Sequence, residues 1–144
     1  MNTKIPTIAV VIPTHNRAGL LQKCIFSVIN QLFSSDQLIV VDDGSSDQTR
    51  KITQSFGSRV EYVYQRNKGA CAARNLGLRL VITDAVLFLD SDDKLGLNDL
   101  EVLRIAFLKT SADVIFGAVR ILNQSGVDEL RRPPSERSSG LFVA

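Results

Sequence analysis

Short continuous apolar runs alternate with stretches of helical periodicity along the chain. Runs rich in Val, Ile and aromatic residues are typical of strands, and here they predict strands at residues 8–12, 38–41, 60–64, 85–89 and 113–122. Between them, apolar residues recur at helical spacing, which predicts helices at residues 18–32, 47–56, 69–81 and 98–109. Ser46 or Asp47 is the expected cap of the second helix, and Asn98 with Glu101 has the spacing of a capping box before the fourth.

The predicted elements alternate strictly between strand and helix. This order is typical of a parallel α/β sheet with helices on both faces. Because crossovers between parallel strands are right-handed, the carboxyl ends of the strands should lie along one edge of the sheet, where ligands bind in such folds. We expect this unit to occupy residues 1–122, and residues 123–144 to form a polar loop with one short strand.

The composition is that of an ordinary globular protein. Of the 144 residues, 44% are hydrophobic and 22% are charged, which supports one core. The net charge of +2 does not indicate a nucleic-acid partner or an anionic membrane. Cys24 and Cys71 lie in helical stretches without metal-ligand spacing, so we expect two buried thiols in a reducing compartment.

Neither a signal peptide nor a membrane span is indicated by the apolar pattern. Residues 1–6 lack a long apolar stretch, and no run approaches the roughly 18 apolar residues of a spanning helix. We therefore expect a cytoplasmic protein, and attachment to the inner face of the membrane stays open.

Three acids follow the fourth predicted strand, in the sequence Asp90-Ser91-Asp92-Asp93. Two carboxylates about 4 Å apart repel by roughly 1 kcal/mol in water and about 4 kcal/mol at a partly screened protein surface. The cluster therefore needs a cation, a shared proton or full solvation. A divalent metal that carries a phosphate ligand meets this need; a simple turn of solvated acids is the alternative.

Polar residues also follow the first two predicted strands. Pro13, Thr14 and Asn16 come after the first, where they could contact a nucleotide base or cap the next helix. Asp42 and Asp43 come after the second, and successive side chains at a strand end point apart. One carboxylate could therefore face the ligand and accept the imide N–H of uracil or a similar base, while the other bonds nearby amides; turn formation by both is the alternative.

The third predicted crossover joins a polar loop to a helix of small residues. Asn67 lies in the loop, and Arg74 lies within about two turns of the helix start, whose free amides suit an anion. The side chain of Arg74 either points to the edge where the carboxyl ends of the strands meet, or it is a solvated residue on the helix surface. No G-x-G-x-x-G follows the first strand, which counts against a dinucleotide cofactor, and the P-loop pattern is also absent from the sequence.

Four segments in order, residues 10–16, 39–47, 67–77 and 88–93, together resemble glycosyltransferase family 2 over about residues 7–122. The resemblance implies a GT-A (Rossmann-like) fold and transfer of a sugar from a nucleotide diphosphate sugar, by family habit a UDP-sugar, with inversion at the anomeric carbon. A saccharide or lipid-linked acceptor, Mg²⁺ or Mn²⁺ as cofactor and polysaccharide synthesis are implied in the same way. The matching positions are Asp43 for the base, Pro13 and Thr14 for the base pocket, Arg74 for the phosphates, Asp90 and Asp92 as the D-x-D pair for ribose and metal, and Asp93 as an additional acid.

The chain departs from the family in its length. Family members are larger, and their acidic catalytic base comes from a second, acceptor-binding half. No segment of residues 95–144 resembles that base, although the acids Asp128 and Glu129 stay open as candidates. We therefore expect the donor-binding half of a glycosyltransferase domain, with its base beyond residue 144.

Two other functions stay open. One is a non-catalytic nucleotide- or sugar-binding module. The other is a nucleotidyltransferase with a similar sheet, but that class would want a Gly-rich basic loop after the first strand, which residues 14–20 do not provide.

Overall fold

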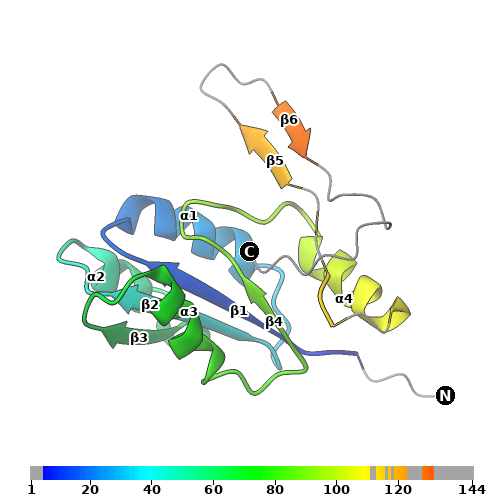
Figure 1. Cartoon of the computed structure of the whole chain (residues 1–144), viewed down its shortest axis with the longest axis horizontal. Helices are drawn as coiled ribbons and strands as arrows, with labels where there is room; N and C mark the ends of the chain where they lie inside the picture. The colour runs from blue at the N-terminus through cyan, green and yellow to red at the C-terminus, as the bar shows by residue number, and fades with distance from the viewer. Residues whose placement is uncertain (1–4, 111–112, 116, 118, 123–127, 132–144) are drawn as a thin grey trace.

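A computed structural model describes residues 5–110, 113–115, 117, 119–122 and 128–131 of the chain. Its main body is a four-stranded parallel sheet in the order β3-β2-β1-β4 with helices on both faces (Figure 1). The strands of this sheet are β1 (Ile8–Thr14), β2 (Gln37–Asp43), β3 (Glu61–Gln65) and β4 (Ala85–Phe88). The helices are α1 (Ala18–Ile29), α2 (Thr49–Gln54), the 3₁₀ turn Gly57–Arg59, α3 (Ala70–Leu78) and α4 (Asp99–Lys109). The predicted α/β architecture is confirmed.

The central strand β1 is fully buried because helices cover both of its faces. Its residues Ile8, Val10 and Ile12 belong to a core cluster with the buried face of α1, together with Leu100 of α4. The alternate residue Val11 belongs to a second cluster with β2 and α3 on the opposite face. Burial on both sides explains why these strands read as continuous apolar runs.

Helix α3 lies close to the sheet because it carries a glycine at the contact. A Cβ atom on Gly77 would meet Val11 Cγ1 at 2.3 Å and Val41 Cγ2 at 3.2 Å. Any larger residue would push the helix away from the strands. The glycine of α3 therefore allows the close approach of this helix, which sets the position of Arg74 relative to the sheet edge.

The prediction of a fifth strand at 113–122 in the parallel sheet is wrong. Strand β5 is Val119–Leu122, and it pairs antiparallel with β6 (Asp128–Arg131) in a separate two-stranded sheet (Figure 1). An apolar run does not specify its partner, and pairing with a strand only a few residues away costs less loop entropy than a crossover. Strand β6 is the short strand expected in the tail; residues 123–127 and 132–144 of the tail lie outside the described residues.

The predicted capping box of the fourth helix is also wrong. Asn98 has a left-handed backbone (φ 63°) and its side chain does not cap the helix. Instead, Gln31 Oε1, from the segment after α1, accepts the backbone N–H of Leu100 at 3.2 Å. The free amide of the helix start is thus bonded by a residue that is distant in sequence.

Two further points concern the cysteines and the membrane. Cys24 is buried as predicted. Cys71 is exposed on α3, so the expectation that it is buried is wrong.

Within the described ranges, every helix is too short or too polar to span a bilayer.

Candidate functional site

A pocket of about 410 Å³ lies at the carboxyl end of the parallel sheet. It is formed by the end of β1 and the loop after it, the end of β2, the first half of α3 and the loop after β4. The lining residues are Pro13, Thr14, His15, Arg17, Asp43, Ala70, Ala73, Arg74, Asp90, Ser91 and Asp92.

The structure thus brings together most of the residues selected from the sequence. Of these, the pocket lining contains Pro13, Thr14, Asp43, Arg74, Asp90 and Asp92. It does not contain Asn16, Asp42, Asn67 or Asp93.

Asp43 is fixed at one side of the pocket by three donors. Its Oδ1 accepts hydrogen bonds from Gln65 Nε2 at 2.6 Å and from the backbone N–H of Lys68 at 2.8 Å. Its Oδ2 accepts the backbone N–H of Gly69 at 2.8 Å. Burial alone would raise the pKa of this carboxyl, but the donated hydrogen bonds outweigh burial and hold the pKa below its ordinary value. Since each carboxylate oxygen accepts about two hydrogen bonds, Oδ2 keeps capacity for a ligand donor.

The neighbouring Asp42 has a different task. Its Oδ1 accepts the backbone N–H of Ser45 at 2.8 Å, and its Oδ2 accepts the hydroxyl of Tyr62 at 2.7 Å. Burial, this hydrogen bond and the charge of Asp42 together raise the pKa of Tyr62 well above its ordinary value. Asp42 therefore holds the turn after β2 against β3, while Asp43 faces the pocket.

Asn16 joins the loop after β1 to the loop after β2. Its backbone N–H donates to Ser45 Oγ and its Oδ1 accepts the backbone N–H of Ser46, both at 2.8 Å. The Asn16 amide nitrogen also lies 3.1 Å from His15 Nε2. Since His15 Nδ1 lies 2.8 Å from the carbonyl oxygen of Asp43, which can only accept, Nδ1 carries the proton and Nε2 is the acceptor.

Asn67 borders the site through its backbone, and its Nδ2 lies 3.5 Å from Nε2 of the pocket residue His15. Gly44 has a left-handed backbone (φ 82°), and a Cβ there would lie 2.9 Å from the backbone nitrogen of Asn67. This close approach lets the loop after β3 reach Asp43 with the amides of Lys68 and Gly69. The position of Gly44 thus requires glycine.

Thr14 brings an unpaired polar atom to the pocket. The residue is 4% exposed, and its Oγ1 is buried without a hydrogen-bond partner in the described part of the chain. Buried hydroxyls without partners are rare, because an unmade hydrogen bond costs about 1–3 kcal/mol.

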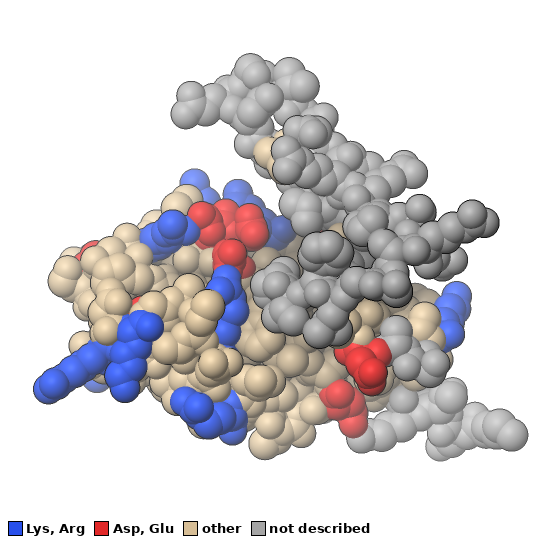
Figure 2. All heavy atoms as spheres, viewed as in Figure 1, with Lys and Arg blue, Asp and Glu red and all other residues tan. Residues whose placement is uncertain are grey.

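Two ion pairs occupy the other side of the pocket. Arg17 Nη1 lies 2.5 Å from Asp92 Oδ2, and Arg74 Nη2 lies 2.5 Å from Asp90 Oδ1. These carboxylates are about half exposed, 46% for Asp92 and 52% for Asp90. Figure 2 shows acidic side chains gathered at one place on the surface with basic side chains beside them. The side chain of Arg74 thus reaches the acidic loop after β4.

The acids of the loop after β4 act on each other and on the buried thiol beneath them. Partial burial raises the pKa of Asp93, and the charges of Asp92 and Asp90 raise it further. The buried thiol of Cys24, whose Sγ lies 3.6 Å from the carbonyl oxygen of Asp90, has its pKa raised to about 12 by burial and then by the same acids.

The three acids do not form one ligand set. Among the described residues, no three His, Cys, Asp or Glu side chains are grouped so that they could hold a metal ion. Asp90 and Asp92 line the pocket, whereas Asp93 does not.

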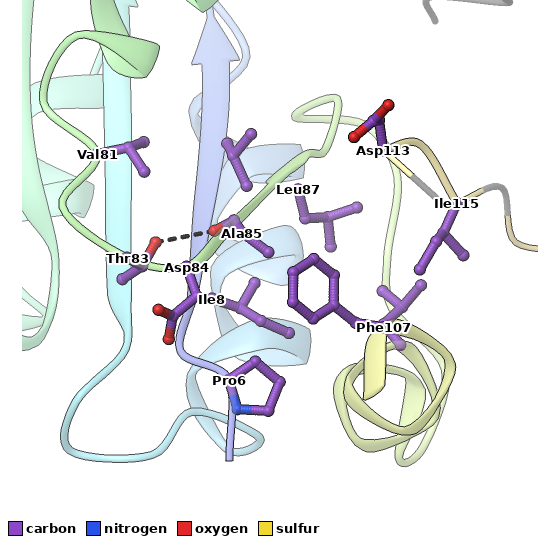
Figure 3. Close-up of a pocket in the computed structure, with 12 residues that line it drawn as sticks. Pro6, Ile8, Val81, Thr83, Asp84, Ala85, Leu87, Phe107, Asp113 and Ile115 are labelled. Atoms are coloured by element: carbon purple, nitrogen blue, oxygen red, sulfur yellow. Dashed lines mark hydrogen bonds between the residues drawn. The ribbon is translucent and has the colours of Figure 1, made fainter. Parts of the chain in front are cut away.

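A second pocket, of about 320 Å³, lies between β4 and α4. Ile8, Leu87 and Phe107 are among its lining residues, and Figure 3 shows them gathered around it. Asp84, one of its acids, accepts hydrogen bonds from the backbone and the hydroxyl of Thr7. This largely apolar pocket offers less chemistry than the pocket at the carboxyl edge.

Sequence reasoning missed Arg17 as a site residue. It stands one position after the first segment that carries the resemblance, and no local signal shows that its side chain reaches a loop 75 residues away. The role of Gln65 in holding Asp43 was missed for the same reason. Gln65 is a polar residue at the carboxyl end of a strand, beside the strand end that carries Asp43. This position is the signal that could have found it.

Comparison with known proteins agrees with this geometry. The model of glycosyl transferase family 2 matches residues 9–141. Glycosyltransferase GlyA of Streptococcus pneumoniae is 35% identical over 82% of this chain and 17% of its own length. The Escherichia coli protein WfgD, named UDP-Glc:alpha-D-GlcNAc-diphosphoundecaprenol beta-1,3-glucosyltransferase, is 32% identical over 83% of this chain and 48% of its own length.

A solved structure shows the same fold. The S. aureus TarS 1–349 complex with UDP-GlcNAc superposes with a TM-score of 0.63 and 28% identity over 72% of this chain and 31% of that one. The present chain therefore spans between 17% and 48% of the length of these relatives.

Proposed function

Because the chain belongs to glycosyl transferase family 2, we propose that its carboxyl-edge pocket binds the donor of a sugar transfer, a nucleotide diphosphate sugar. The donor nucleotide is UDP, and the sugar passes to an acceptor hydroxyl with inversion at the anomeric carbon. In this proposal residues 1–122 form the donor-binding part, and residues 123–144 are the start of the acceptor-binding half.

The observation that carries the proposal is that one pocket holds two different kinds of polar group. At one side, the fixed carboxylate of Asp43 suits the edge of a base. At the other side, two arginines and two acids suit a diphosphate with a cation. A nucleoside diphosphate has these two ends, and Asp43 would accept the imide N–H of its uracil.

The acids of the pocket fit a divalent cation. Mg²⁺ in nucleotide sites is commonly held by one or two carboxylates together with substrate phosphates and water. Asp92 and Asp90, which both line the pocket, supply such oxygens. A bound Mg²⁺ or Mn²⁺ would neutralise charge on the leaving diphosphate. Asp93 raises the local negative charge without lining the pocket.

The protein's own residues position the donor. Arg74 is held by α3 beside Asp90, where its guanidinium can bind a phosphate oxygen in place of the carboxylate. Pro13 and Thr14 form the floor beneath the base, with Asn16, Asp42 and Asn67 holding the three loops around it. None of these pocket residues is assigned the role of the base that deprotonates the acceptor.

The names of the relatives suggest the donor and the acceptor. The TarS structure contains UDP-GlcNAc, and the name of WfgD specifies UDP-Glc and a lipid-linked acceptor. We take UDP as the nucleotide and a saccharide or lipid-linked sugar as the acceptor. Such an acceptor would place the protein in the cytoplasm at the inner face of the membrane, in the synthesis of a surface polysaccharide.

The second candidate function is nucleotide binding without sugar transfer, and it would use the same pocket.

Calorimetry with UDP in the presence of Mn²⁺ tests the proposal. We expect Asp92→Ala to weaken Mn²⁺-dependent UDP binding by at least about tenfold, since even groups that only support a metal ligand are worth that much. The matched control is Asp93→Ala, which removes a charge from the same loop but not from the pocket lining. The proposal fails if wild-type protein does not bind UDP, and the metal assignment fails if both variants bind equally well.

A further inference from the structure

Arg17 and the proposed metal ligand Asp92 already form a pair. Arg17 Nη1 and Asp92 Oδ2 are 2.5 Å apart, across the pocket that both residues line. A guanidinium and a divalent cation use the same carboxylate oxygens. Since two cations at one carboxylate repel each other, a metal ion at Asp92 weakens the hold of this carboxylate on Arg17.

The side chain of Arg17 can move without disturbing the fold. Its backbone is fixed at the start of α1, where its carbonyl oxygen accepts the N–H groups of Leu20 and Leu21. The next residue, Ala18, is held through its N–H by Asp47 Oδ2 at 3.0 Å. The Arg17 side chain itself is 48% exposed, against 24% for Arg74, so of the two arginines Arg17 is the less confined.

A displaced Arg17 remains beside the cation and its phosphates. Arginine binds phosphate through two parallel N–H groups and keeps its charge at any physiological pH. Arg17 and Asp92 line the same pocket as the Arg74–Asp90 pair. A diphosphate bound to a metal at Asp92 would therefore lie within reach of both guanidinium groups.

We propose that Arg17 is an exchangeable counterion: it neutralises Asp92 in the donor-free site, gives this carboxylate up to the divalent cation, and then binds the diphosphate of the donor. The inference rests on the proposed function and adds a residue and an order of events to it. Arg17 disfavours the metal when the nucleotide is absent and favours the nucleotide when the metal is present. Metal and nucleotide binding are then mutually enhancing, because linkage between two ligands is reciprocal.

The first measurement is Mn²⁺ binding without nucleotide, followed by the loss of the free-ion electron paramagnetic resonance signal, with the full 144-residue chain. We expect Arg17→Ala to bind Mn²⁺ about two- to fivefold more tightly than wild type, the range that an exposed ion pair is worth. The matched control is Lys94→Ala. Lys94 lies in the same loop as Asp92 but makes no ion pair within the described ranges. An equal gain in Lys94→Ala, or no gain in Arg17→Ala, overturns the exchange.

The second measurement is UDP binding by calorimetry at saturating Mn²⁺. Here we expect Arg17→Ala to bind UDP about three- to tenfold more weakly than wild type, as loss of a charge-assisted hydrogen bond in an exposed position predicts. Arg17→Lys keeps the charge but lacks the planar guanidinium with its paired N–H donors. This variant should therefore keep wild-type Mn²⁺ affinity and still lose UDP affinity. If the wild-type chain binds Mn²⁺ but not UDP, the proposed function fails. If wild type binds UDP and Arg17→Ala binds it equally well, only the exchange fails.

Discussion

The end of β2 and the loop after β4 both place acids at the same edge of the sheet, but they hold those acids in different ways. Asp43, the last residue of β2, is 4% exposed and bonded by neutral donors, two of them backbone amides. Asp90 and Asp92, after β4, are about half exposed and paired with arginine side chains. The pKa of Asp43 lies below its ordinary value, whereas that of Asp93 in the loop after β4 lies above it.

The difference suggests two kinds of binding within one pocket. Backbone donors stay in place whether or not a ligand is present, so Asp43 is oriented in advance and suits recognition of a fixed shape. Charged side chains at a half-exposed position can change partners at low cost, because such pairs are worth at most about 1 kcal/mol. The acidic loop therefore suits ligands that are exchanged, a cation and a diphosphate.

The largest effect is expected at the fixed side. Asp43→Asn replaces an accepting oxygen by an NH₂ group and removes the charge, so we expect the affinity for uridine and for UDP to fall together by about 10- to 100-fold. Calorimetry with both ligands measures this. Asp42→Asn is the control: it should destabilise the turn near Tyr62 while nucleotide affinity is kept. A loss for UDP but not for uridine would place Asp43 at the phosphates instead.

The second-largest effect is expected at Arg74, on the side of the pocket proposed to bind the diphosphate. Arg74→Met should lower UDP affinity by about tenfold through the lost charge-assisted contact, and leave uridine affinity unchanged. The same pair of titrations measures both values. Arg79→Met, in the residue directly after α3, is the matched control and should change neither. Equal losses for uridine and UDP in Arg74→Met would contradict the assignment of Arg74 to the phosphates.

The smallest effect is on stability as a function of pH. The lowered pKa of Asp43 means that its contribution is full above the ordinary Asp pKa of about 3.9 and is lost as the pH falls through the lower value of the folded state. Asp93 has the opposite sign. Its raised pKa makes the folded state the tighter proton binder, so its ionisation costs stability as the pH rises from about 3.9 through the raised value.

Urea unfolding at several pH values checks these signs. Asp93→Asn should be more stable than wild type at neutral pH, by less than about 1 kcal/mol, and the difference should vanish in acid. Asp43→Asn should be less stable at neutral pH, with a gap that closes as the pH falls below about 3.9. A gain from Asp93→Asn that persists in acid would show that charge is not its cause.

The sequence by itself determined the sheet and the edge at which the acids meet. Apolar runs such as 8–12 and 38–41 predict strands buried on both faces, and the handedness of crossovers then puts their carboxyl ends together. The family was also predicted from sequence, and the match to residues 9–141 confirms it. These features depend on local periodicity and on general rules of chain connection, which a sequence carries directly.

Only the tertiary structure decided that Asp42 binds Tyr62, which strand pairs with β5, and that Arg17 meets Asp92. Each of these contacts depends on how loops far apart in the chain pack together, and on which donors remain free once they have done so. The periodicity of a segment gives the direction of its own side chains. It does not give the identity of the group that they meet.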